Sequence, residues 1–262
     1  MGLRIHDKST ISASISTREK LILAGLYLSK YDSLGLKKLG FESFVEAFNV
    51  IGYALGSRPA SIKNYRDEFD PLFPNKRKGW HKRGTRDYCL AIFERYNGLD
   101  FESFTGLVGS FWGLDENKDS EVIPSEQQDE SQSTFAQRLI TGLAAERYFE
   151  SVQAGIPEFK DYLMENTTRF GCGYDFRLRV EPNDKDFFAV EVKGLKEQTG
   201  SVMMTPKEYS VAERLRDRFF LFVVRNFRES PSHEIFKNPL SSPLNFRRIE
   251  RVTIQVSWLT TV

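Results

Sequence analysis

Two short apolar runs in the second half of the chain constrain its fold most strongly. Residues 187–194 read FFAVEVKG and residues 218–227 read RFFLFVVRNF. Both runs are rich in aromatic and β-branched side chains, and each has the length of a strand rather than of a helix. They predict strands that are buried in a sheet, so the second half of the chain should contain a β-sheet domain.

Around these two runs the sequence changes repeatedly between helix and strand patterns. The predicted order is a helix at residues 135–152, strands at 173–180, 187–194 and 201–204, a helix at 206–217 and a strand at 218–227. A further strand is predicted within residues 247–259. Helix, three strands, helix and strand together indicate a domain of mixed α and β structure.

The first 112 residues have a different pattern, with apolar residues at helical spacing. Ser16 and Glu19 have the spacing of a capping box, and further helices are predicted within residues 40–56 and 57–73. The last two helices are separated by a turn that contains Gly56, which is the outline of a helix-turn-helix unit. A packed helical core with a solvated polar face explains the same pattern equally well.

A nucleic-acid contact is one interpretation of the polar residues in this region. Residues 75–88, NKRKGWHKRGTRDY, form the densest basic stretch of the chain and include an aromatic ring that could stack or wedge. The candidate contacts are Lys63, Asn64 and Arg66 on the helix, and Lys76, Arg77, Lys78, Trp80, Lys82 and Arg83 in the basic stretch. The alternative is a mobile, solvated loop.

The composition divides the chain into three parts. Residues 113–134 are acidic, polar and poor in large apolar side chains, so they are predicted to be a linker. The expected organisation is a helical domain at residues 1–112, the linker at 113–134 and a mixed domain at 135–262. With 40% hydrophobic residues and a net charge of +1, the whole chain has the composition of a soluble globular protein.

Several classes of protein are not indicated by the sequence. It has neither an apolar signal segment nor a stretch long enough to cross a membrane, so a cytoplasmic location is expected. Cys89 and Cys172 have no disulfide or zinc spacing, and there is no glycine-rich phosphate loop with a lysine, so no nucleotide cofactor is expected. His6, His81 and His233 are far apart and suggest no nucleophile with an oriented base.

The chemically informative residues are charged side chains in predicted strands. Alternate side chains of a strand share a face, so Glu191 and Lys193 should point the same way. If the strand that contains Asp175 forms a hairpin with theirs, Asp175 and Glu191 could reach one hard cation, with the Val192 carbonyl as a further ligand. A half-exposed strand with a polar outer face is the simpler alternative.

Such an arrangement suits hydrolysis of a phosphodiester bond. A magnesium ion polarises the phosphoryl group, and an ammonium group at Lys193 would stabilise the negative transition state or exchange a proton. Glu146, on the helix before the strands, is the expected fourth member of the site, and Glu150 one turn later is the alternative. Thr205, Pro206 and Glu208 are explained by the capped start of a helix, without a chemical role.

These segments resemble a known nuclease superfamily. The segment GCGYD, which ends at Asp175, the segment EVKG, which begins at Glu191, and the later SVMMTPKEY and FFLFVV resemble the PD-(D/E)XK nuclease superfamily. Within it they are most similar to domains of unknown function in bacterial restriction and phage-defence proteins. The resemblance covers about residues 135–227, and Tyr174 stands where the superfamily has its proline.

The resemblance implies both a fold and an activity. The fold would be a restriction-endonuclease-like αβββαβ core with a mixed sheet. The activity would be cleavage of DNA with Mg²⁺, or Mn²⁺ in its place, with Asp175 and Glu191 as metal ligands, Lys193 as the catalytic lysine and Glu146 as the helix acid. The expected protein is therefore a restriction or phage-defence endonuclease that acts on double-stranded DNA.

The sequence also leads to an expected oligomeric state and allows two alternative functions. A homodimer is expected because cutting both strands of a duplex needs two sites related by two-fold symmetry. One alternative is a non-catalytic DNA-binding or regulatory protein that uses the nuclease-like fold as a scaffold. The other is a nuclease subunit of a larger defence complex.

Overall fold

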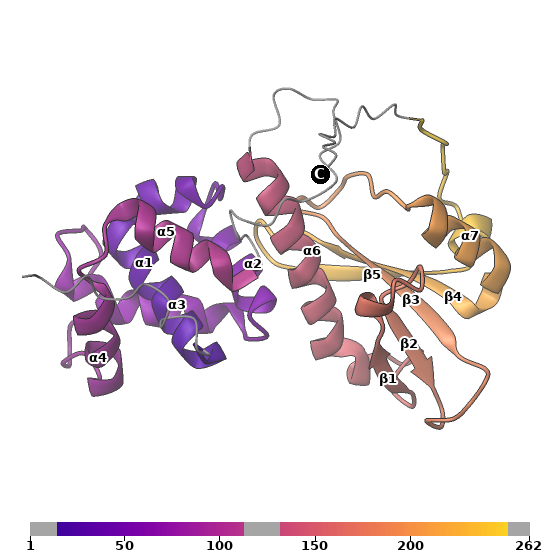
Figure 1. The fold of residues 1–262 in the computed structure, drawn as a ribbon, viewed down its shortest axis with the longest axis horizontal. Helices are drawn as coiled ribbons and strands as arrows, with labels where there is room; N and C mark the ends of the chain where they lie inside the picture. The colour runs from indigo at the N-terminus through magenta and orange to yellow at the C-terminus, as the bar shows by residue number, and fades with distance from the viewer. Residues whose placement is uncertain (1–14, 113–131, 251–262) are drawn as a thin grey trace, which may run out of the picture.

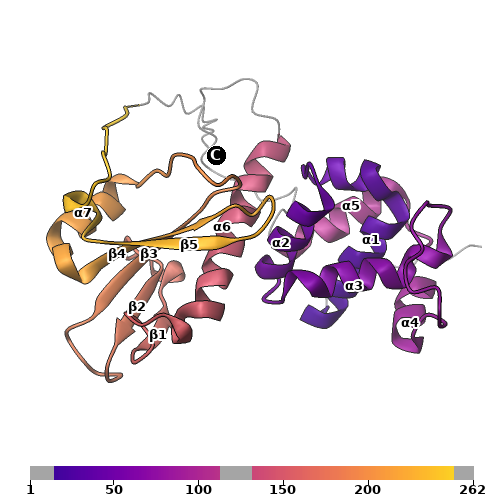
Figure 2. The ribbon, with the colours of Figure 1, turned by 180° about the vertical axis from the view of Figure 1, so that it is seen from behind.

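The structure is a computed structural model that describes residues 15–112 and 132–250. In these ranges it contains seven α-helices and one five-stranded sheet. Figures 1 and 2 show a helical region on one side of the molecule and the sheet on the other, with helix α6 between them. The predicted fold class, a helical N-terminal region followed by an α+β domain with a mixed sheet, is confirmed.

The N-terminal region consists of five helices: α1 (Thr17–Lys38), α2 (Phe44–Ala54), α3 (Pro59–Phe69), α4 (Asp87–Tyr96) and α5 (Phe101–Gly109). The predicted capping box at the start of α1 is present. The Ser16 side chain accepts a hydrogen bond from the Glu19 amide, and the Glu19 carboxylate accepts one from the Ser16 amide at 2.9 Å. The start of α1 is therefore fixed by the local sequence.

The sheet domain begins with α6 (Gln132–Val152). The elements that follow are β1 (Leu163–Asn166), β2 (Phe176–Arg179), β3 (Phe188–Gly194), α7 (Pro206–Leu215), β4 (Phe219–Arg225) and β5 (Ser232–Lys237). The strands lie in the order β1-β2-β3-β4-β5, and only the β3–β4 pair is parallel. Helix α7 provides the crossover that a parallel pair requires.

Two of the predicted strands need correction, and two of the observed strands were not predicted. Residues 201–204 are not a strand; they lead directly into the N-cap of α7, and Met204 packs beside Val211. The third strand before α7 is β1 instead, and β5 was not predicted. Within the predicted strand at 247–259, residues 247–250 are not in a strand, and residues 251–259 lie outside the described part of the chain.

The two faces of the sheet carry different apolar cores. On the α6 face, the Phe149 ring lies 4.9 Å from the ring of Phe176 and 4.8 Å from that of Phe222. On the α7 face, a smaller cluster includes Ala189 of β3 and Val211 of α7. Because side chains alternate along a strand, Glu191 and Lys193 lie on the same face as Ala189, towards α7.

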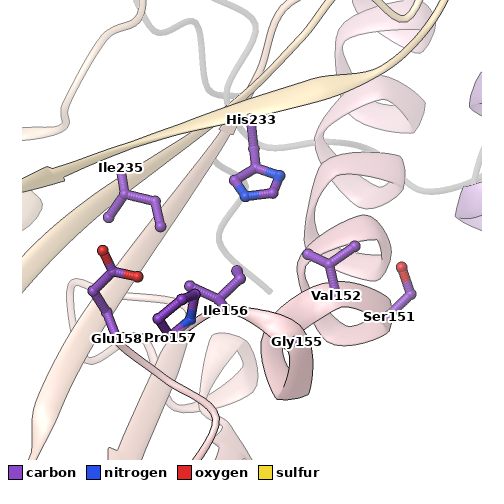
Figure 3. A pocket seen from close by; sticks show the side chains of 8 residues that line it. All are labelled: Ser151, Val152, Gly155, Ile156, Pro157, Glu158, His233 and Ile235. Atoms are coloured by element: carbon purple, nitrogen blue, oxygen red, sulfur yellow. The ribbon is translucent and has the colours of Figure 1, made fainter.

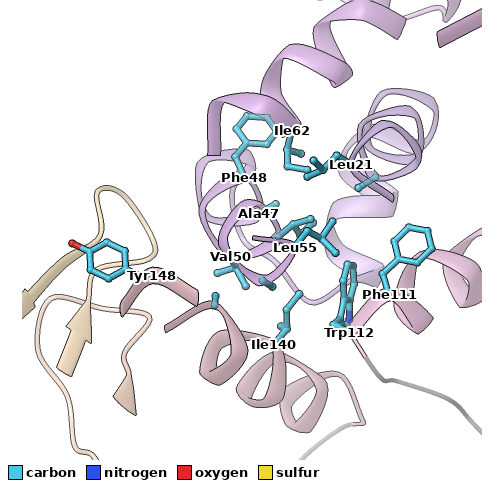
Figure 4. Close-up of a cluster of buried hydrophobic side chains, with 14 of the residues drawn as sticks. Leu21, Ala47, Phe48, Val50, Leu55, Ile62, Phe111, Trp112, Ile140 and Tyr148 are labelled. Carbon is cyan, nitrogen blue, oxygen red and sulfur yellow. The ribbon is translucent and has the colours of Figure 1, made fainter. Parts of the chain in front are cut away.

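The helical region and the sheet domain share one hydrophobic cluster. Figure 4 shows Val50 and Leu55 of the helical region close to Ile140 of α6. The Asn49 side-chain amide donates hydrogen bonds to the backbone carbonyls of Phe227 and Glu229, at 2.9 and 3.0 Å. The two predicted domains therefore pack against each other through a shared hydrophobic core.

The last three residues of the predicted linker are helical. Residues 132–134, which were assigned to it, form the start of α6, and residues 113–131 lie outside the described part of the chain. None of the helices in the described ranges is both long enough and apolar enough to cross a lipid bilayer.

Candidate functional site

The pairing of β2 with β3 brings Asp175 beside Glu191 and Lys193. Phe176 lies opposite Val190, so the predicted hairpin is confirmed. Asp175 precedes β2, and its amide donates a 3.0 Å hydrogen bond to the Val190 carbonyl. The Val192 amide in turn donates to Asp175 Oδ2 at 2.9 Å. The Asp175 carboxylate is therefore attached to the backbone of β3 between Glu191 and Lys193.

The charges within the buried strand β3 satisfy one another. Glu191 is only 3% exposed, and its Oε1 lies 2.6 Å from Lys193 Nζ. Lys193 Nζ also donates to Glu208 Oε2 at 2.8 Å. A buried charge is costly unless it is paired and hydrogen-bonded, so these contacts explain how β3 can carry the buried charge of Glu191 and the half-buried charge of Lys193.

Glu208 has a second role that was not predicted. It is the third residue of α7 and closes a capping box: its amide donates to Thr205 Oγ1, and its Oε2 accepts from the Thr205 amide at 3.0 Å. The prediction that capping alone explains Glu208 is wrong, because the same oxygen holds Lys193. No sequence motif of fixed spacing relates Glu208 to Lys193. The available signal was that α7 connects the parallel strands β3 and β4, which places its first turn near the end of β3.

Glu146 of α6 lies within electrostatic range of Asp175 and Lys193. Burial and the negative charges of Asp175 and Glu150 raise its pKa to about 7, and Lys193 offsets only part of this effect. Glu150 is differently engaged, since its carboxylate pairs with Arg147 at 2.7 Å and accepts from the Asn166 amide at 3.2 Å. The structure thus brings Glu146, rather than Glu150, into electrostatic contact with the predicted site residues.

The site is richer in carboxylates than in cations. Burial raises the pKa of Asp175, and the Val192 amide and Lys193 offset this only in part. Burial and the charge of Asp175 raise the pKa of Glu191, despite its contact with Lys193. Burial alone would lower the pKa of Lys193, but its ion pairs with Glu191 and Glu208 outweigh burial and raise it. Lys193 is therefore a stable ammonium group.

These donors are chemically suited to a hard divalent cation. Carboxylate oxygens are the ligands that Mg²⁺ prefers, and the carboxylates of the site outnumber its one ammonium group, Lys193. Asp175 and Glu191 are the residues that would hold the ion. Within the described ranges, however, no group of three or more His, Cys, Asp or Glu side chains is arranged to hold a metal ion. Oxygens of Glu191 and Glu208 contact Lys193 instead.

The raised pKa of Glu146 predicts a pH-dependent stability in the absence of metal. A carboxyl group whose pKa is higher in the folded state than in the unfolded state stabilises the fold at low pH and loses this effect as pH rises through the folded value. With a pKa of about 7 in place of 4.5, ionised Glu146 should cost ~2 kcal/mol of unfolding free energy after allowance for solvent screening. Chemical denaturation in EDTA at pH 5 and pH 8 measures the loss.

Glu146→Gln is the variant that isolates this effect. The difference in stability between the variant and the wild type should grow in favour of the variant as pH rises. His233 acts in the opposite direction, since burial lowers its pKa and so favours the folded state as pH rises. Because the His233 contribution is common to both proteins, it cancels in the comparison. A difference that is constant with pH would contradict the assignment of Glu146 to the charge cluster.

The predicted nucleic-acid contact at Arg66 is wrong. Arg66 is only 9% exposed, and its guanidinium group lies 2.7 Å from the Asp67 carboxylate. It also lies over the rings of Phe44 and Phe48, in each case 4.9 Å from the ring centroid. These contacts are those of an arginine that joins α2 to α3, so Arg66 does not lie on an exposed polar face.

Two arginines of the basic stretch also stabilise the fold. Arg77 pairs with Asp70 at 2.9 Å and with Asp32 at 2.7 Å. Arg83 donates two hydrogen bonds to the buried carboxylate of Glu68, at 2.8 and 2.7 Å. Although burial acts to raise the pKa of Glu68, hydrogen bonds from Arg83 and its neighbours lower it to about 2. The prediction of phosphate contacts did not foresee that these guanidinium groups already bind carboxylates.

The basic stretch is packed against α3 rather than projecting freely. The Trp80 amide donates to the Asp67 carbonyl at 2.9 Å, and Trp80 Nε1 donates to the Asn64 carbonyl at 3.3 Å. Gly79 has φ +52, and a Cβ atom there would lie 2.3 Å from the Asp67 carbonyl oxygen, so only glycine fits. The predicted residues that are exposed are Lys63, Asn64, Lys76, Lys78, Trp80, Lys82 and Arg83, of which Arg83 is nevertheless paired with Glu68.

A separate hollow lies between β5 and the end of α6. Its volume is about 450 Å³, and its lining includes Val152, Ile156, Glu158, His233 and Ile235. Figure 3 shows His233 and Ile235 projecting from β5 towards the segment that carries Ile156 and Glu158. Asp175, Glu191 and Lys193 are not part of this lining. The cluster of acids around Lys193 is therefore distinct from the hollow.

Comparison with known proteins gives one match. The family model described as Protein NO VEIN, C-terminal, matches residues 145–237. No curated protein and no solved structure matches the chain. The matched stretch contains Glu146, Asp175, Glu191, Lys193 and Glu208, so the whole candidate site lies in the part of the chain that is similar to this family.

Proposed function

We propose that this protein is a Mg²⁺-dependent DNA endonuclease of the PD-(D/E)XK type that acts in restriction or phage defence. The observation that carries the proposal is the convergence of Asp175, Glu191 and Lys193 on adjoining strands, with Lys193 Nζ 2.6 Å from Glu191. Supporting it, α6 contributes Glu146 to the same cluster, and the element order around the site is αβββαβ.

Each side chain has a defined part in the proposed reaction. Lys193 remains protonated, so it stabilises the negative charge that develops on the scissile phosphate rather than acting as a base. Asp175 and Glu191 would hold Mg²⁺, and the ion would polarise the phosphoryl group and lower the pKa of a water molecule. Glu146, with a pKa of about 7, can accept a proton near neutral pH.

The helical region would hold the DNA. Lys63, Lys78 and Lys82 are exposed, and Trp80 offers a ring that is 44% exposed on the same surface. Lysine contacts to phosphate provide affinity without sequence specificity, and such binding weakens as the salt concentration rises. A homodimer, which would place one site on each strand of a duplex, remains part of the proposal.

Incubation with supercoiled plasmid tests the proposed activity. We expect nicked or linear products in Mg²⁺ or Mn²⁺ and intact plasmid when EDTA removes the metal, because the carboxylates alone cannot neutralise the phosphate. Product is followed on agarose gels over time. Plasmid that stays intact in Mg²⁺ although the protein demonstrably binds it would contradict the proposal.

A non-catalytic DNA-binding protein is the second candidate function. It is favoured by the engagement of Lys193, whose ammonium group is held by two carboxylates at 2.6 and 2.8 Å. A purely structural lysine would have the same contacts. The plasmid assay separates the two functions, and a mass measurement on protein from its native cell tests whether cleavage needs a larger complex.

Glu208 offers a prediction with a matched control in the same chain. Glu208→Gln should keep the capping box, because a glutamine oxygen can also accept from the Thr205 amide, but it removes the charge that positions Lys193. We expect kcat to fall roughly ten- to a hundredfold with little change in KM. Steady-state cleavage of a labelled oligonucleotide duplex measures both.

The control is Glu19→Gln in the capping box of α1. Ser16 and Glu19 have the same geometry as Thr205 and Glu208, and Glu19 has no contact with the site. Both variants should change thermal stability by similar small amounts, and only Glu208→Gln should lower kcat. Equal effects on kcat would show that the loss comes from weaker helix capping rather than from the position of Lys193.

A further inference from the structure

The loop between β1 and β2 exposes a large aromatic side chain next to the candidate site. Phe170 is 68% exposed, the most exposed of the large apolar side chains in the described ranges. Its neighbour Arg169 is also exposed. A single exposed apolar side chain is common on protein surfaces. Phe170 is of interest because it lies in a closed loop that ends at Asp175.

Hydrogen bonds from Thr167 close this loop at Asp175. The Thr167 amide donates to the Asp175 carbonyl at 2.7 Å, and the buried Thr167 hydroxyl donates to the carbonyls of Tyr174 and Asp175, at 3.1 Å each. Compact loops whose ends meet in this way are often functional. Phe170 and Arg169 are therefore carried by a loop whose two ends are fixed at a residue of the site.

The first turn of α7 lies against the same loop. A Cβ atom on Gly173 would lie 3.2 Å from the Lys207 side chain and 3.0 Å from that of Val211. Lys207 is exposed, and so is Met203, which precedes the helix. Glu208, which holds Lys193, follows Lys207 directly in the sequence. The loop ends at Asp175, and the start of α7 carries Glu208, so both segments are attached to the acidic centre. Together they carry two exposed cations, Arg169 and Lys207, and two exposed apolar side chains, Phe170 and Met203, and this surface is called the border of the site.

We propose that this border binds unpaired nucleotides, so that the site acts on single-stranded or locally unpaired DNA. The cations would contact phosphates, and the Phe170 ring would stack on a base. Base faces are covered by neighbouring bases in an intact duplex and become available only where the bases are unstacked. Aromatic side chains within a basic surface are the combination that single-stranded nucleic acid uses.

This inference rests on the proposed function, but its test needs no cleavage. The full chain carrying Lys193→Met is compared with the same protein that also carries Phe170→Ala. The probes are a short oligonucleotide with 2-aminopurine and a fluorescent label, either single-stranded or in a complete duplex. Anisotropy gives the affinity, and 2-aminopurine quenching reports stacking on the ring.

We expect Phe170→Ala to weaken single-strand binding about tenfold and to abolish the quenching. Duplex binding should change by less than about twofold, since lysine contacts to phosphate supply it. Leu163→Ala is the matched control, because Leu163 is 53% exposed and lies at the opposite end of β1 from the loop. It should change neither affinity.

Three outcomes would overturn the inference: unchanged single-strand affinity in the Phe170→Ala protein, an equal loss for both probes, or a change in oligomeric mass, which would make Phe170 a contact between copies. The proposed function fails differently, when plasmid that the wild-type protein binds stays intact in Mg²⁺. If single-strand binding depends on the Phe170 ring but the wild-type protein does not cleave DNA, the binding inference is supported and the proposed nuclease activity is rejected.

Discussion

Lys193→Met should reduce Mg²⁺-dependent DNA cleavage by about 10²–10³-fold or more. Methionine has a side chain of similar length without the ammonium group, so the contacts of Lys193 with Glu191 and Glu208 are lost together with the positive charge at the phosphate. Initial rates of plasmid cleavage measure the loss, and anisotropy with labelled duplex should show that DNA binding persists.

The control for this experiment is Lys185→Met. Lys185 is exposed in the turn between β2 and β3, so its replacement changes the net charge by the same amount and should leave the rate within about twofold. Asp175→Asn gives an independent check, because an asparagine oxygen can still accept from the Val192 amide while the charge is removed. Full activity in either Lys193→Met or Asp175→Asn would rule out the proposed site.

Phe149→Ala should have the largest effect on stability, with a loss of about 3–5 kcal/mol of unfolding free energy. Phe149 is fully buried and contacts the rings of Phe159, Phe176 and Phe222 at centroid distances of 5.8, 4.9 and 4.8 Å. Alanine would leave a cavity between α6 and the sheet. Urea denaturation followed by circular dichroism measures the loss.

Leu139→Ala provides the comparison on the same helix. Leu139 is 44% exposed, so its truncation should cost less than about 1 kcal/mol. If both variants lost the same stability, α6 would be held by something other than the aromatic cluster. Cleavage by the Phe149→Ala protein should also fall at temperatures where it remains folded, because α6 carries Glu146 into the charge cluster.

The central part of the site could be predicted because it depends on local geometry. Glu191 and Lys193 share a face through strand alternation, and Asp175 reaches them through a hairpin between neighbouring strands. The position of Glu208 beside Lys193 depends on how α7 crosses from β3 to β4, which is set by tertiary structure and not by local sequence. Its capping-box spacing gave a sufficient local explanation and concealed its contact with Lys193.

The strands that were not predicted lie at the edges of the sheet. β1 has four residues, Leu163–Asn166, of which three are exposed, and β5 begins with three exposed residues. Such strands lack the apolar run that identified β3 and β4, and their pairing depends on the strands beside them. Residues 201–204 have a strand-like composition, but Met204 packs against the apolar cluster on the α7 face and Met203 is exposed.

The basic stretch shows the same limit for charged residues. Arg77 and Arg83 are close in sequence to many lysines, which suggests a phosphate-binding surface. Their partners Asp70 and Glu68 belong to the turn after α3 and to the end of α3, respectively, and only the folded chain shows that these carboxylates are buried. A dense run of positive charge therefore did not distinguish arginines that hold the fold from lysines that remain free.

The attachment of the helical region to the sheet domain has a consequence for the products of the proposed DNA cleavage. The Asn49 amide binds the chain just after β4, and Lys196, three residues beyond Lys193, pairs with Glu42 and Glu46 before and within α2. A duplex gripped near Lys78 would thus be cut at a constant offset from the grip. Fragment ends should then fall at one preferred spacing from the bound segment instead of being scattered along it.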